Sequence, residues 1–142
     1  MLSSPYPVPN LRIWRTAMIL GWLCGAAAGV WVLVDPPKSY QGIGLTLTIM
    51  WGIMLALGSA ATALAHAIRS YQIEIPGLIL ALGGIVVYDY LSWQATFGDS
   101  PGSGPRALLL ALLAFLVVGR IRMLLYIDRE ARKLVDLREA VG

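Results

Sequence analysis

The fold is decided by residues 42–68, which read GIGLTLTIMWGIMLALGSAATALAHAI. These 27 residues contain no Asp, Glu, Lys or Arg. A helix rises ~1.5 Å per residue, so the segment is long enough to cross the ~30 Å apolar core of a bilayer. A helix also satisfies its own backbone hydrogen bonds, for which lipid offers no partners. We therefore predict a transmembrane helix over about residues 43–66.

The composition of the whole chain indicates the same solvent. Only 13% of its 142 residues are charged, whereas soluble domains carry about 25%. A chain with so few charges does not cover a water-facing surface in the ordinary way, and lipid is the simplest alternative. The sequence therefore predicts an all-α polytopic membrane protein.

A further span is predicted at residues 17–34, which are also free of charge. Arg12, Trp14 and Arg15 precede it, and cations beside an amphipathic ring are typical of a membrane boundary. A cleaved signal peptide is the alternative interpretation of this run. The apolar residues continue well beyond the small-residue stretch at 26–28, which favours a retained span.

A third span is predicted at residues 75–93. Glu74 precedes it, and a carboxylate is favourable at the N-terminus of a helix. Pro76 is expected in the first helical turn, where its missing N–H does no harm. Aromatic residues at positions 88–93 mark the opposite membrane interface.

The fourth span is predicted at residues 107–127, after a loop rich in glycine and proline. It reaches spanning length only by including Arg120 and Arg122, whose long side chains extend back to the headgroups. Residues 128–142 form a charged tail, which we expect to continue as a helix in water or along the membrane surface.

Four spans place both termini on the same side of the membrane. Of the eleven cations, only Lys38 and Arg106 fall on the opposite side. The positive-inside rule then puts the N-terminal arm at residues 1–16, and the tail, in the cytoplasm. The nine cations on the predicted cytoplasmic side are Arg12, Arg15, Arg69, Arg120, Arg122, Arg129, Arg132, Lys133 and Arg138.

Small residues recur along the first span. Gly21, Gly25 and Gly29 are four residues apart, so they lie on one face of the helix. Such a ridge lets two helix backbones approach closely, and packing is what drives helix association in lipid. The ridge predicts either packing within one four-helix bundle or self-association between copies.

Few polar residues lie near the predicted spans. Glu74 is expected near the cytoplasmic boundary, where it either pairs with Arg120 or Arg122 or is solvated separately among the headgroups. His66 is expected at the same boundary. Asp89 is expected just below the opposite interface, where a structural role is favoured over an ion or proton relay.

No catalytic constellation is found in the sequence. There is no nucleophile motif, no phosphate-binding glycine loop and no paired-cysteine metal motif, and the single cysteine, Cys24, is interpreted as a small packing residue. We predict a non-enzyme without cofactor or metal. Nucleic-acid binding is not expected, because no basic stretch is interleaved with aromatic residues on a soluble element.

The chain resembles the small four-span, holin-like membrane proteins that actinobacterial phages encode in their lysis cassettes. The resemblance covers roughly residues 14–126. It rests on the DPPKSY loop at residues 35–40 and on Leu45-Thr46, Trp51, Leu57-Gly58, Glu74, Gly77, Gly83-Gly84 and Tyr88.

This resemblance implies a multi-pass protein of the bacterial host's cytoplasmic membrane. It would associate with itself in the bilayer and permeabilise the membrane during lysis, alongside an endolysin or a second small membrane protein. One alternative is a small channel or transporter subunit, in which Asp89, His66 or Glu74 lines a polar path. Another is a non-enzymatic interaction protein of the superinfection-exclusion type.

Overall fold

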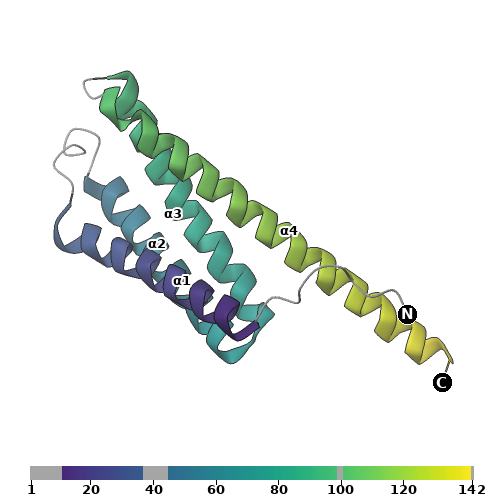
Figure 1. Ribbon diagram of the computed structural model, residues 1–142. Coiled ribbons are helices and arrows are strands. Elements are labelled where there is room, and N and C mark those ends of the chain that lie inside the picture. Colours follow the sequence, from purple (N-terminus) through teal and green to yellow (C-terminus); the bar gives the residue numbers. More distant parts are fainter. Residues whose placement is uncertain (1–10, 37–44, 99–100, 142) are drawn as a thin grey trace.

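In the residues that it describes, the computed structural model has four long helices and one short 3-10 turn (Figure 1). It describes residues 11–36, 45–98 and 101–141, so the predicted arm up to residue 10 and Lys38 of the first loop lie outside the described residues. The elements are α1 (Leu11–Val34), α2 (Leu45–Ile68), α3 (Tyr71–Phe97), η2 (Pro101–Ser103) and α4 (Gly104–Val141).

Each of the four helices is long and apolar enough to cross a membrane. The protein is therefore an all-α, multi-pass membrane protein. The predicted cytoplasmic location of both termini stays a prediction. Helix α4 is 38 residues long, and in Figure 1 its last turns extend beyond the other three helices.

Helix α3 begins earlier than the sequence pattern suggests. Only Arg69 and Ser70 separate it from α2, so its first turn starts at Tyr71 and Pro76 lies inside the helix. Pro76 has no N–H to donate to the carbonyl of Gln72, one turn earlier. The expectation that Pro76 occupies the first turn was wrong, because the tight turn after α2 starts the new helix at once.

The helices pack in the order of the chain. Helix α2 lies between α1 and α3, and α4 packs against α3. The core is formed mainly by the inner pair, α2 and α3, where Leu78 and Ile85 are buried and Trp51 stacks on Tyr88 with 4.3 Å between ring centroids. In an 18-residue apolar stretch of each helix, 39% of the residues are buried in α2 and in α3, against 11% in α1 and in α4.

The outer pair, α1 and α4, exposes large apolar side chains along its length. In water such a surface would promote aggregation, but against acyl chains it is the expected surface. This exposure supports contact with a lipid bilayer. Examples are Ile13, Leu20, Trp31 and Val34 on α1, and Leu109, Phe115 and Leu116 on α4.

Candidate functional site

The turn between α2 and α3 brings chemistry-bearing residues together. Arg69 adopts a positive φ of 60°, which turns the chain within two residues. The amide of Ser70 donates to the carbonyl of Ala65 at 3.0 Å, and the amide of Glu74 donates to that of Ser70 at 3.2 Å. The end of α2 and the start of α3 are thereby fixed side by side, so His66 and Glu74 face each other.

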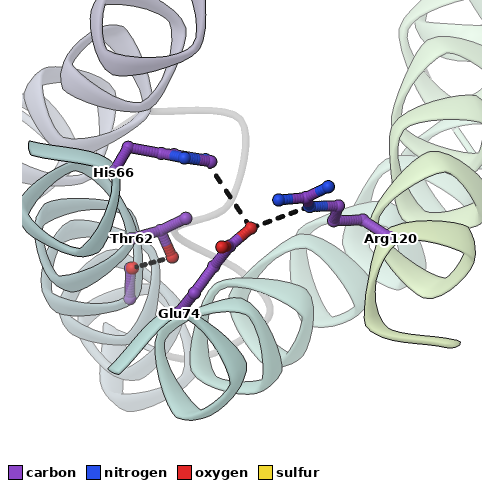
Figure 2. Close-up of polar contacts among 5 residues, drawn as sticks. Thr62, His66, Glu74 and Arg120 are labelled. Carbon is purple, nitrogen blue, oxygen red and sulfur yellow. Dashed lines mark hydrogen bonds and ion pairs between the residues drawn. The ribbon is translucent and has the colours of Figure 1, made fainter. Parts of the chain in front are cut away.

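Glu74 is the centre of this cluster (Figure 2). Its carboxylate accepts a hydrogen bond from Arg120 Nε at 2.8 Å, which joins α3 to α4. The Nε2 atom of His66 lies 3.7 Å from the same Glu74 oxygen, too far for a hydrogen bond. The three residues, His66, Glu74 and Arg120, are called the charge cluster below. They come from three different helices at the cation-rich end of the bundle, where the Arg120–Glu74 bond joins α4 to α3.

The contribution of the Arg120–Glu74 ion pair to stability depends on its burial. Glu74 is only 5% exposed, whereas a third of the Arg120 side chain remains accessible. A buried carboxylate is expensive without a partner, so removing Arg120 would leave an uncompensated charge. The position of Glu74 in the first turn of α3 adds a favourable interaction with the helix dipole.

A cavity of about 640 Å³ lies beside the charge cluster. Four arginines line it, together with His66 and several residues of α1, and we call it the basic cavity. Arg15 also donates from Nη2 to the carbonyl of Ala67 at 3.3 Å, which ties the start of α1 to the end of α2. The four arginines are Arg12, Arg15, Arg69 and Arg120.

An apolar groove of about 470 Å³ continues from the basic cavity. Its walls are α1 and α4, and Leu55, Ser59 and Ile85 of the inner pair form its floor. Trp14, Met18 and Arg120 line both the cavity and the groove. The groove exists because α1 packs on α2 and α4 packs on α3, which leaves α1 and α4 apart along this face.

The three ridge glycines of α1 have different surroundings. A Cβ on Gly25 would lie 2.7 Å from Ser59 Oγ, and one on Gly29 would lie 2.5 Å from the backbone nitrogen of Ala56. Both therefore face α2 of the same chain. Gly21 has no neighbour within 4 Å of such a Cβ and lines the groove. A role of the ridge between copies stays a prediction.

The remaining candidate residues are not brought into the charge cluster. Arg122 is exposed on α4, and it is Arg120 that pairs with Glu74. Asp89 lies on α3 fifteen residues from Glu74, or ~22 Å along the helix. Within the described residues, no group of three or more His, Cys, Asp or Glu side chains is placed to hold a metal ion.

The basic cavity is the feature that the sequence pattern did not predict. Arg12, Arg15 and Arg69 were interpreted as markers of membrane orientation, each at its own helix end. Their convergence depends on which helices are neighbours, which local patterns do not specify. At the opposite end, the pattern also gave no sign that Arg106 lies 5.7 Å above the ring of Tyr88.

No family model matches the chain, and neither the curated proteins nor the solved structures contain a match to it. The resemblance to holin-like phage proteins stays a prediction.

Proposed function

We propose that this is a holin-like membrane protein, which associates laterally in the cytoplasmic membrane of a bacterial host and permeabilises it during phage lysis. It acts without catalysis, cofactor or metal, alongside an endolysin or a second small membrane protein. The observation that supports this proposal is the contrast between a filled bundle interior and two outer helices whose apolar faces are left uncovered.

The filled interior argues that one copy does not conduct by itself. Trp51, Leu78, Ile85 and Leu91 are almost completely buried between the helices. Between Glu74 and Asp89, α3 buries only apolar residues and glycine, so the two ends of the bundle are not joined by a polar path along this helix. Permeabilisation then requires several copies, whereas a channel or transporter subunit would need such a path.

One stripe on α1 provides a surface for association. Ile13, Leu20, Cys24 and Trp31 recur at spacings that place them on one face of the helix, and all four are exposed. This face lies to the side of the one that carries the ridge glycines. In lipid, its contact with a second copy would be stabilised by packing rather than by removal of apolar surface from water.

Cys24 makes the proposal testable in the native sequence, because it is the only cysteine and is exposed on this stripe. The full chain is expressed from an inducible promoter in a bacterium, and membrane potential is followed with a dye. Samples are oxidised at intervals to form Cys24–Cys24 disulfides, with Cys24→Ser as the control. We expect disulfide-linked dimers to accumulate before the potential collapses.

Two results would overturn the proposal. A protein that reaches high abundance in the membrane and leaves the potential intact is not a holin. If the same cells instead resist phage infection, the exclusion-type interaction protein becomes the better interpretation. If the potential falls gradually with expression and no dimer is ever trapped, conduction by single copies replaces assembly.

A further inference from the structure

We propose that the basic cavity and the apolar groove together bind one anionic phospholipid. The phosphate lies among the arginines of the cavity, and one acyl chain lies in the groove between α1 and α4. This site goes beyond the proposed lytic function and does not depend on it.

The first argument is that the two spaces form one continuous site. Trp14, Met18 and Arg120 line both of them, so a ligand with a charged head and an apolar tail would pass these residues at the junction. Arg120 is held there by its 2.8 Å bond to Glu74. The charge cluster thus keeps a guanidinium at the point where the head of the ligand meets its tail.

The second argument is charge. Four arginines line the cavity, and within the described residues the Glu74 carboxylate pairs with one of them, Arg120. Guanidinium groups bind phosphate oxygens through paired N–H donors, and basic pockets between membrane helices bind anionic headgroups. Arg15 uses one nitrogen on Ala67, which orients its side chain across the α1–α2 contact and leaves other N–H groups for a ligand.

The third argument is the depth of the groove. On α1 it extends from Trp14 to Gly25, eleven residues or ~16 Å. This depth matches one leaflet, about half of the ~30 Å apolar core, as an acyl chain requires. A helix of a second copy would need a seam through both leaflets, whereas no described residue of α1 beyond Gly25 lines the groove.

Gly21 gives the groove its width. A Cβ at this position would meet nothing within 4 Å, so a larger side chain would fit without disturbing the protein and would occupy the groove itself. Gly119 on α4 is an equally open glycine, and it does not line the groove. The chain therefore offers a blocking variant and a matched control.

Native mass spectrometry of the full chain tests the site. The protein is presented with phosphatidylglycerol and phosphatidylcholine at equal concentrations in detergent, and retained lipids are counted. We expect one retained phosphatidylglycerol in preference to phosphatidylcholine. Arg15→Gln and Arg69→Gln should each weaken this preference about fivefold, the equivalent of ~1 kcal/mol per cation. Arg122→Gln, which removes an exposed cation at the same end, should leave it unchanged.

Gly21→Leu tests the tail separately from the head. It should release the lipid although every arginine is present, whereas Gly119→Leu should retain it. Circular dichroism and the elution volume confirm that each variant is folded. If Arg15→Gln, Arg69→Gln and Arg122→Gln weaken the lipid preference equally, the preference comes from unspecific surface charge and not from a site. Unchanged lipid retention in Gly21→Leu would overturn the acyl-chain site. A change in oligomer mass in this variant, without loss of lipid, would also overturn it and would favour a second copy in the groove.

Discussion

Glycine is used in opposite ways between the inner helices, α2 and α3, and on the open faces of the outer helices, α1 and α4. Between α2 and α3, a Cβ on Gly84 would lie 2.8 Å from the backbone nitrogen of Leu55. On the outer pair, Gly21 and Gly119 have no neighbour within 4 Å. The inner pair is thus held by close approach of two backbones, as expected where apolar side chains gain nothing from leaving lipid. The outer pair leaves its surface to lipid and to other molecules in the membrane.

The largest effect is expected from Gly84→Leu. The atoms nearest to the added side chain are backbone atoms of Leu55 and Trp51, which cannot move aside by changing rotamer. Helices α2 and α3 must therefore separate. We expect a loss of at least ~3 kcal/mol, the upper end for overpacking, and little protein in the membrane fraction. Gly119→Leu is the control on the outer pair and should accumulate normally. Equal accumulation of the two variants would remove the distinction between the pairs.

A smaller loss, ~2 kcal/mol, is expected from Gly25→Leu, because α1 contacts α2 here through the side chain of Ser59. Thermal unfolding in detergent measures the loss, and Gly21→Leu should unfold like the parent. Since Gly25 faces its own chain, disulfide trapping through Cys24 should be unchanged per folded molecule. Loss of trapping with normal stability would instead place the ridge between copies.

The ion pair of the charge cluster can be compared with an exposed ion pair of equal length on α4. Arg120–Glu74 and Lys133–Glu130 are both 2.8 Å long, but Glu74 is buried whereas the Glu130 side chain is 44% exposed. We expect Glu74→Gln to lower the free energy of unfolding by ~1 kcal/mol, a value reduced from that of fully buried pairs because Arg120 is partly exposed. Glu130→Gln should have no measurable effect.

Charge reversal sharpens this prediction. Glu74→Lys should impair accumulation more than Glu74→Gln, because it places a second cation against Arg120. Combining Glu74→Lys with Arg120→Glu should recover part of the loss. If neither single variant differs from the parent in accumulation and unfolding temperature, the ion pair does not stabilise the bundle.

The smallest effect is expected from Arg69→Gly, and it has the opposite sign. A positive φ is unfavourable for a side chain by ~1–2 kcal/mol, and glycine removes this strain at the end of α2. The greater freedom of glycine in the unfolded chain offsets part of the gain, so we expect stabilisation of up to ~1 kcal/mol. Arg122→Gly, inside α4, should destabilise by a similar amount. Destabilisation by Arg69→Gly would show that its side chain, not its backbone, holds the turn.

The four spans were predictable because each is bounded by charges, prolines or aromatic residues that mark a membrane boundary. Glu74 and Arg120 were predictable as one of two candidate pairs, since both lie near the same end of their helices. The choice of Arg120 over Arg122 depends on the rotation of α4 about its axis, which a nearly uniform apolar sequence leaves unspecified.

The start of α3 and the groove were not predictable from sequence. The early start depends on a positive φ at Arg69, and arginine gives no signal of that conformation. The groove depends on how far α1 and α4 stay apart, a property of two helices that are distant in the chain. Gly21 carries no sequence mark that separates it from Gly25 and Gly29, which pack against α2.

The two-residue link between α2 and α3 also bears on how the protein is made. During synthesis, α3 leaves the insertion machinery tethered to α2 by a link that spans at most ~7 Å. Because this link holds the two helices side by side, we expect the inner pair to pack together as soon as α3 enters the bilayer. In the described part of the chain, the extensive helix contacts join neighbours in sequence, so each new helix docks on its predecessor. We therefore expect assembly in the order of translation, with α1 and α2 in place before Arg120 reaches the Glu74 carboxylate.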